Sequence, residues 1–224
     1  MLQVKYTNAI LGAKGSGKSV LLCHLAMKET KKVVLFDVLG VFNPRNEYKT
    51  ATIPNSYYCM SIEDFLRNIN KFPEKSKIVI NLSDYNNKDL IESMDAFCLK
   101  LMEIKKPISV LSDEVADIMP QNGVGSEQFH KMVKNGRNYG ITPITIATQR
   151  PQSVNKNVFD LCDTFLISSQ KAPRTVDYIA SIIDVGGNED IKQVIKSLKS
   201  REFIIYDGEI ERFTVPEYPY AFKQ

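Results

Sequence analysis

Eight consecutive residues near the start of the chain have the types and spacing of a phosphate-binding loop. Their sequence is Gly12-Ala13-Lys14-Gly15-Ser16-Gly17-Lys18-Ser19, which fits the pattern GxxxxGK(S/T). Glycines at these offsets let backbone N–H groups surround phosphate oxygens, and the start of a following helix adds partial positive charge. Lys18 is placed to bridge the β- and γ-phosphates, and the Ser19 hydroxyl to hold Mg²⁺. The predicted site for ATP and Mg²⁺ comprises Gly12, Lys14, Gly15, Ser16, Gly17, Lys18 and Ser19.

Two consecutive acids, Asp113 and Glu114, follow the apolar run Ile108 to Ser112, which predicts a buried strand. Beside a phosphate-binding loop, Asp113 can bind Mg²⁺ through water, and Glu114 can polarise an attacking water molecule. A glutamate in this place suits hydrolysis, whereas a nucleotide-binding switch or a small-molecule kinase would not need it. The predicted chemistry is therefore ATP hydrolysis.

The residues around these motifs alternate between strand-like and helix-like patterns. Continuous apolar runs are typical of a parallel sheet with both faces covered, so we expect an α/β fold. The expected strands are Asn8–Gly12, Val33–Asp37, Ile78–Leu82, Ile108–Ser112, Ile144–Thr148 and Thr164–Ser168. The expected helices are Lys18–Glu29, one with a capping box beginning at Ser61, Lys88–Lys105, Ser126–Tyr139, Val176–Ile183 and Asp190–Leu198. A β-hairpin, Phe203–Tyr206 with Ile210–Val215, should turn at Asp207-Gly208, and residues 43–55 should form a surface loop.

Composition and charge limit the classes of protein that fit. The 224-residue chain contains 43% hydrophobic and 25% charged residues, which excludes a disordered chain. Its length suits one ATPase domain over residues 1–215 and a Pro- and Tyr-rich tail over residues 216–224. No apolar run approaches the roughly 20 residues of a membrane helix, and no secretion signal is visible, so we expect a cytoplasmic protein. The net charge is only +3, so DNA contacts would need local basic clusters. The four cysteines lack zinc-ligand spacing and are expected to be buried thiols.

The segment after the acid pair resembles the FtsK–HerA superfamily of ring-forming ATPases. The resemblance rests on Gly136-Arg137-Asn138-Tyr139-Gly140-Ile141 and on Ala147-Thr148-Gln149-Arg150-Pro151, and it extends from about Ala9 to Ser169. It implies a P-loop NTPase fold of the RecA-like (ASCE) type, with a mostly parallel central sheet flanked by helices. It also implies that Gln149 contacts the γ-phosphate or the attacking water. Arg137 would reach into the neighbouring subunit's site and neutralise charge on the transferring phosphoryl group, with Arg150 and, less strongly, Arg174 as competing candidates.

The resemblance further implies a homo-oligomeric ring, a hexamer or a pentamer, that moves double-stranded DNA through its channel. A bare ATPase domain of this size is similar to the branch that packages viral genomes, where a capsid vertex or portal protein would be a further partner. The alternatives are a cellular or plasmid HerA/FtsK-like translocase in repair or transfer and, from another class, a P-loop ATPase of phage assembly or export. The loop Asp117 to Glu127 is a candidate for coupling hydrolysis to movement in the channel. The candidate phosphate contacts, which would not depend on DNA sequence, are Lys131, Lys134, Lys171 and Arg174.

Overall fold

The computed structural model describes residues 5–42, 53–183 and 189–215. Its strands are β1 (Thr7–Leu11), β2 (Lys32–Asp37), β3 (Tyr57–Cys59), β4 (Lys77–Asn81), β5 (Ile108–Ser112), β6 (Ile141–Thr148), β7 (Thr164–Ser168), β8 (Glu202–Tyr206) and β9 (Ile210–Thr214). Its α-helices are α1 (Lys18–Lys28), α2 (Ile62–Asn68), α3 (Asn87–Ile104), α4 (Glu127–Asn135), α5 (Lys156–Phe159), α6 (Pro173–Ile182) and α7 (Glu189–Ser197). Short 3₁₀ helices span Val115–Asp117, Gly136–Tyr139 and Pro151–Ser153. The expected tail, residues 216–224, and residues 43–52 of the expected surface loop lie outside the described residues.

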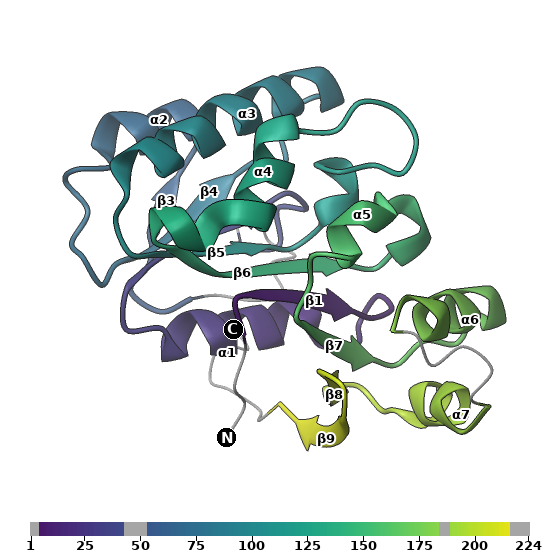
Figure 1. The fold of residues 1–224 in the computed structure, drawn as a ribbon. Coiled ribbons are helices and arrows are strands. Elements are labelled where there is room, and N and C mark those ends of the chain that lie inside the picture. The colour runs from purple at the N-terminus through teal and green to yellow at the C-terminus, as the bar shows by residue number, and fades with distance from the viewer. Residues whose placement is uncertain (1–4, 43–52, 184–188, 216–224) are drawn as a thin grey trace.

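The described strands form one sheet in the order β3-β4-β2-β5-β6-β1-β7-β8-β9 (Figure 1). Neighbouring strands from β3 to β7 are parallel, and β8 and β9 continue the sheet as an antiparallel hairpin. The predicted mostly parallel sheet with a C-terminal hairpin is therefore confirmed. In a sheet of this kind, ligands bind beyond the carboxyl ends of the strands, where the chain turns in opposite directions from neighbouring strands.

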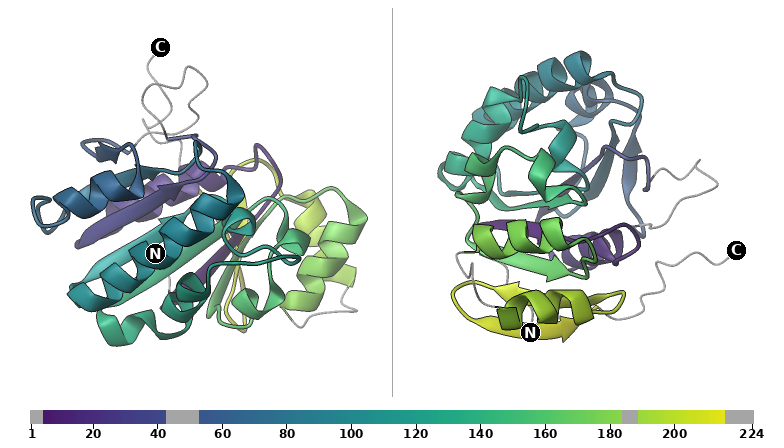
Figure 2. Two further views of the ribbon diagram at one scale, coloured as in Figure 1. Left: turned by 90° about the horizontal axis from the view of Figure 1, so that it is seen from above. Right: turned by 90° about the vertical axis from the view of Figure 1, so that its right-hand side faces the viewer.

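Helices cover both faces of the sheet (Figure 2). Because successive side chains of a strand point to opposite faces, β2 contributes to two separate cores. Val33 and Leu35 pack in the cluster that contains the buried face of α1. Val34 and Phe36 pack in the larger cluster with residues of α2, α3, α4, α6 and α7. None of the described helices is long and apolar enough to cross a membrane.

Several local predictions differ from the structure, and helix α5 was also not expected. Edge strand β3 was not expected, and the expected helix Ser126–Tyr139 ends its α-helical part at Asn135 and continues as a 3₁₀ turn. Strand β6 begins three residues before the expected start at Ile144, although Pro143 lacks an N–H donor for the ladder. A bulge accommodates it, because the pairing with β5 shifts register between Ile108 and Val110. Of the thiols expected to be buried, only Cys162 is half-buried.

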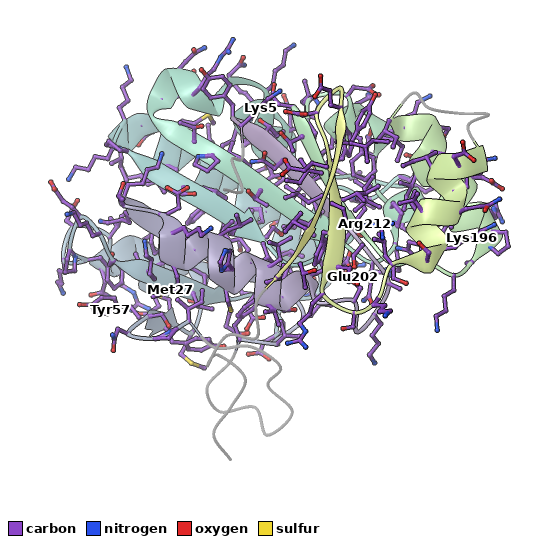
Figure 3. The ribbon with its side chains drawn as sticks, turned by 90° about the horizontal axis from the view of Figure 1, so that it is seen from below. Lys5, Met27, Tyr57, Lys196, Glu202 and Arg212 are labelled. Carbon is purple, nitrogen blue, oxygen red and sulfur yellow. The ribbon has the colours of Figure 1, made fainter. Side chains whose placement is uncertain are left out.

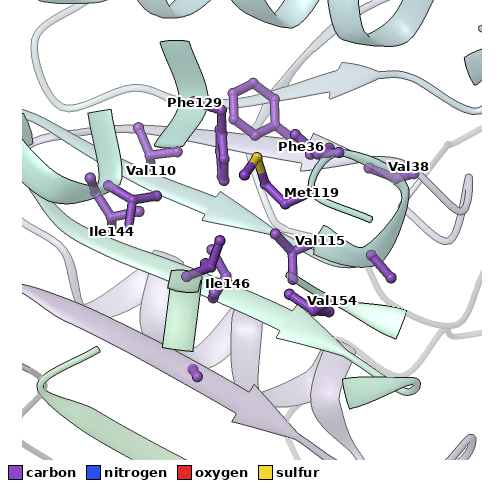
Figure 4. Packing of buried hydrophobic residues seen from close by; sticks show 14 of the residues in the cluster. Phe36, Val38, Val110, Val115, Met119, Phe129, Ile144, Ile146 and Val154 are labelled. Atoms are coloured by element: carbon purple, nitrogen blue, oxygen red, sulfur yellow. The ribbon is translucent and has the colours of Figure 1, made fainter. Parts of the chain in front are cut away.

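The segment after β5 is anchored to the core rather than lying freely on the surface. Val115 and Met119 pack beside Phe36, Phe129 and Val154 in one apolar cluster (Figure 4). The rings of Phe36 and Phe129 meet edge to face with centroids 6.4 Å apart. This packing fixes the backbone that leaves the acid pair.

Candidate nucleotide-binding site

The phosphate-binding loop joins the carboxyl end of β1 to the first turn of α1, as the motif requires. Two of its glycines are needed for close approach. A Cβ on Gly12 would lie 2.5 Å from the Ser16 hydroxyl oxygen. Gly17 has a φ of 100°, and a Cβ there would lie 2.9 Å from Cγ of Arg201. Larger residues at either position would therefore deform the loop.

Lys18 turns its ammonium group back into this loop. Its Nζ donates hydrogen bonds to the carbonyl oxygens of Gly12 (2.8 Å) and Ala13 (2.9 Å). Burial lowers the pKa of Lys18, and the nearby negative charges of Glu114 and Asp113 oppose that shift. The lysine is thus held by two neutral acceptors that phosphate oxygens can replace with stronger, charge-assisted bonds.

One cavity of about 560 Å³ brings most of the predicted residues together, and its size is typical of a small-molecule site. It is lined by Lys14, Gly15, Gly17, Lys18, Ser19, Val20, Leu39, Val41, Asp113, Gln149, Ser200 and Arg201. Asp113 and Gln149 follow β5 and β6, so the carboxyl ends of parallel strands deliver them to the same edge as the loop. The Ser16 hydroxyl is buried without a hydrogen-bond partner in the described structure, an unsatisfied donor that fits a phosphate oxygen.

Asp113 lies beside a second buried acid, Asp37. The carboxylate of Asp113 accepts hydrogen bonds from the backbone N–H groups of Val38 (2.8 Å) and Leu39 (3.2 Å). Burial raises the pKa of Asp113 well above its usual value, and the adjacent charge of Asp37 raises it further. Burial likewise raises the pKa of Asp37 to about 7. Hydrogen bonds from the turn after Asp37, including one from Phe42 N–H at 3.1 Å, lower this pKa but only partly offset the effect of burial. Asp37 is thus held by the turn that follows β2.

The donor set of the cavity also fits a magnesium ion. Ser19 supplies a hydroxyl and Asp113 a carboxylate on the same cavity wall. Mg²⁺ prefers oxygen ligands and usually takes few protein groups, completing its shell with water and substrate phosphates. A cation there would also favour the charged form of Asp113, whose burial otherwise disfavours it.

Glu114 is fully buried and is held by groups of the protein. Its carboxylate accepts hydrogen bonds from the Thr148 hydroxyl, the Gln149 N–H and the Ala116 N–H. The described residues that line the cavity include Asp113, which precedes Glu114 in the chain, and Gln149, which binds it, but they do not include Glu114 itself. Glu114, the predicted catalytic carboxylate, therefore lies directly behind the cavity wall.

The structure separates the two competing arginines. Arg137 is exposed at the amino end of β6, with its guanidinium carbon 5.6 Å from the centre of the Tyr6 ring. It lines a different cavity of about 170 Å³ together with Lys134. The eight residues of β6 separate it from Gln149 by roughly 23 Å at about 3.3 Å per residue. Arg150 follows β6 at the carboxyl edge and forms a 2.8 Å ion pair with Asp117.

The candidate DNA contacts fall into two exposed pairs. Lys131 and Lys134 lie on α4, and Lys134 reaches the edge of the sheet that carries Arg137. Lys171 and Arg174 lie around the start of α6, beyond the carboxyl end of β7 (Figure 1). Lys134 therefore lies at the edge of the sheet opposite to Lys171 and Arg174.

Two residues that line the cavity, Ser200 and Arg201, were not predicted from the sequence. They belong to the turn before β8, where Arg201 has a φ of 68°. The hairpin that follows, marked by Glu202 and Arg212 in Figure 3, lies away from the Met27 end of α1 and near its beginning. No motif marks these positions, because pairing of β8 with β7 alone brings them to the loop.

Comparison with known proteins agrees with this architecture. The sequence matches no protein-family model, and a search of curated proteins found no match. Among solved structures, the genome packaging NTPase B204 from Sulfolobus turreted icosahedral virus 2, in complex with AMP, matches with a TM-score of 0.67 and 18% identity over 94% of this chain and 98% of that chain. The DNA-packaging ATPase B204 of Sulfolobus turreted icosahedral virus matches with a TM-score of 0.62 and 16% identity over the same shares. The plasmid coupling protein TrwB, in complex with ADP and Mg²⁺, matches with a TM-score of 0.67 and 11% identity over 98% of this chain and 87% of that chain.

These likenesses establish the fold. The chain has the fold of P-loop NTPases, and specifically the one found in B204 and TrwB. The resemblance seen in the sequence is therefore confirmed at the level of the fold.

Proposed function

We propose that this chain is the subunit of an ATP-hydrolysing ring that translocates double-stranded DNA, and that it packages a viral genome into a capsid. One observation carries the proposal. Lys18, Asp113 and Gln149 share one cavity, whereas Arg137 lies at the opposite edge of the same sheet. A catalytic arginine in that place acts only on a nucleotide bound by a neighbouring copy.

Each residue of the cavity has a separable task. The loop N–H groups and Lys18 bind the phosphates of ATP, and the apolar wall of Leu39 and Val41 limits access of water. Ser19 and Asp113 would hold Mg²⁺, which would neutralise phosphate charge when bound. Glu114 accepts a proton from the attacking water, and Gln149 orients that water or the γ-phosphate.

A ring follows from the place of Arg137. In a cyclic assembly, the arginine edge of one subunit faces the cavity of the next, so each site is completed in trans. The guanidinium then stabilises charge on the transferring phosphoryl group, a contribution of about 10³–10⁵-fold in other phosphoryl-transfer systems. The number of subunits, five or six, is part of the proposal.

Double-stranded DNA as the cargo and a capsid vertex or portal protein as the docking partner come from the likeness to the B204 proteins, which are named for genome and DNA packaging. The second candidate is a plasmid or cellular translocase, favoured by the equally high TM-score of the coupling protein TrwB. Neighbouring genes separate the two, since capsid genes support packaging and nuclease genes support repair or transfer.

The first experiment is the steady-state ATPase rate with and without long double-stranded DNA, together with the mass from light scattering. A ring-sized mass and a rate raised by DNA are expected. Lys18→Ala protein is the control for contaminating ATPases. A monomer whose turnover ignores DNA would contradict the motor while leaving the nucleotide site intact.

A further inference from the structure

The ends of β5 and β6 are joined by buried hydrogen bonds around the carboxylate of Glu114. Its Oε1 accepts from the Thr148 hydroxyl and, at 3.4 Å, from the Ala116 N–H. Its Oε2 accepts from the Gln149 N–H at 3.2 Å. Both Glu114 and Thr148 are buried, so water does not compete for these bonds.

The direction of the Thr148 hydrogen bond is determined by its other partner. The Thr148 hydroxyl oxygen accepts a hydrogen bond from the Arg150 N–H at 3.0 Å. A hydroxyl has one hydrogen to donate, and the amide occupies an acceptor position of its oxygen. The hydroxyl hydrogen therefore points at Glu114, whose charge makes this bond stronger than one between neutral groups.

The two oxygens of Glu114 are consequently not equivalent. A carboxylate oxygen has about two acceptor positions, and those of Oε1 are both filled by the protein. Oε2 has one partner, the N–H of Gln149, and one position left. Gln149 also lines the nucleotide cavity, so Oε2 is the oxygen that is bonded to a residue of the cavity wall.

We propose that Thr148 is a positioning residue for ATP hydrolysis, which holds Oε1 of Glu114 so that Oε2 is the oxygen that receives the proton of the attacking water. This inference rests on the proposed hydrolytic function. Thr148 is not among the described residues that line the cavity, and it acts through Glu114. It keeps the carboxylate in place, while Oε2 retains an acceptor position for the proton.

The surrounding backbone holds Thr148 itself in position. Arg150, whose N–H binds the Thr148 hydroxyl, pairs with Asp117 on the segment that leaves β5. Main-chain hydrogen bonds between Gln121 N–H and Ser153 carbonyl (2.7 Å), and between Asn155 N–H and Met119 carbonyl (2.9 Å), tie the same two segments together. The expected coupling loop, Asp117 to Glu127, is thus joined to the segment that orients the catalytic acid.

Three single variants of the full chain test this role. Thr148→Val keeps the shape and removes the hydroxyl, Thr148→Ser keeps the hydroxyl, and Thr145→Val is the matched control. Thr145 is buried on the same strand, where its hydroxyl accepts a hydrogen bond from the Asn8 side chain. We expect Thr148→Val to lower kcat by about 100-fold, the order of loss from a catalytic group misplaced by ~1 Å, with the Kd for Mg-ATP unchanged. Thr148→Ser should restore kcat, and Thr145→Val should keep it while lowering the melting temperature.

A double variant separates positioning from a general effect on folding. In a Glu114→Gln background, Thr148→Val should cause no further loss of the residual rate, because both changes act on the same carboxyl group. Additive losses, an unchanged kcat in Thr148→Val, or a failure of Thr148→Ser to restore it would each overturn the inference. Thr148→Ala replaces Thr148→Val if the melting curve shows that the latter does not fold. If the wild type and Thr148→Val hydrolyse ATP equally fast, the positioning role is refuted and the proposed hydrolytic function stands. If neither the wild type nor any variant hydrolyses ATP, the proposed hydrolytic function is refuted as well.

Discussion

The hydroxyl of Ser200 donates a hydrogen bond to the carbonyl oxygen of Gly15 at 3.0 Å, across 185 positions of sequence. The next residue, Arg201, donates its backbone N–H to the Ser16 carbonyl at 2.8 Å. The turn that precedes the C-terminal hairpin is therefore bonded directly to the phosphate-binding loop.

This contact predicts that Gly17→Ala disrupts the site. The new Cβ would lie 2.9 Å from Arg201 Cγ and 3.1 Å from its Cα, on a backbone with a φ of 100°. A left-handed backbone alone costs about 1–3 kcal/mol in a residue other than glycine. We expect a lower melting temperature and no measurable binding of a fluorescent ATP analogue.

The matched control is Gly208→Ala. Gly208 has a φ of 109°, but a Cβ there has no heavy atom within 4 Å. It should lose stability through backbone strain alone and still bind nucleotide. Equal loss of binding in both variants would refute the contact with Arg201 as the cause.

Lys18→Ala should abolish nucleotide binding. The ammonium group is held inside the loop by two backbone carbonyls, which the phosphate oxygens of ATP would replace. Isothermal titration with Mg-ATP measures the effect, and Lys28→Ala, at the exposed end of α1, is the control. Binding within a few-fold of wild type in Lys18→Ala would place the nucleotide elsewhere.

Glu114→Gln should bind ATP normally and fail to turn it over. The amide keeps the size of the side chain but cannot accept a proton, so the loss in kcat should be about 10²–10⁴-fold. Single-turnover hydrolysis and equilibrium binding separate the two effects. A variant with near-normal turnover would show that another group activates the water.

Arg137→Ala should also bind ATP normally and lose turnover, because the arginine is supplied to a neighbour. Mixing Arg137→Ala with Glu114→Gln protein is the sharper measurement. In mixed rings, the intact cavity of an Arg137→Ala subunit lies next to the intact arginine of a Glu114→Gln subunit. Two proteins that are inactive alone should therefore regain turnover when mixed. Dilution of the wild type below the dissociation constant of its subunit contacts should lower the rate per subunit.

Arg150→Ala provides the comparison for this experiment. Arg150 lies at the carboxyl edge and is paired with Asp117 in its own chain. Turnover could recover when Arg150→Ala is mixed with Glu114→Gln but not when Arg137→Ala is. That result would show that Arg150, rather than Arg137, acts in the neighbouring subunit's site. A wild-type rate per subunit that stays constant on dilution would contradict any arginine in trans.

Local patterns predicted much of the fold and of the cavity. The predicted helix cap at Ser61 is present, since its hydroxyl accepts a hydrogen bond from Asp64 N–H at 3.2 Å. The Asp64 carboxylate accepts from the N–H of Met60 rather than from that of Ser61, so the reciprocal half of a capping box is made one residue earlier. The start of β6 was misplaced, because the effect of Pro143 depends on a bulge formed with a neighbouring strand. Edge strand β3 was missed, because three residues are too short for a periodic signal and form a strand only by pairing with β4.

The sequence by itself determined the phosphate-binding loop, the acid pair and the alternation of strands and helices, because each depends on neighbours along the chain. The order of strands in the sheet cannot be predicted from local sequence, because hydrogen bonding between strands joins segments that are far apart in sequence. The tertiary structure alone decided that Asp113 and Gln149 share the cavity of Lys18 while Arg137 lies at the other edge of the sheet. It also decided that Thr148 holds Glu114, because the pairing of β5 with β6 places those two side chains in contact.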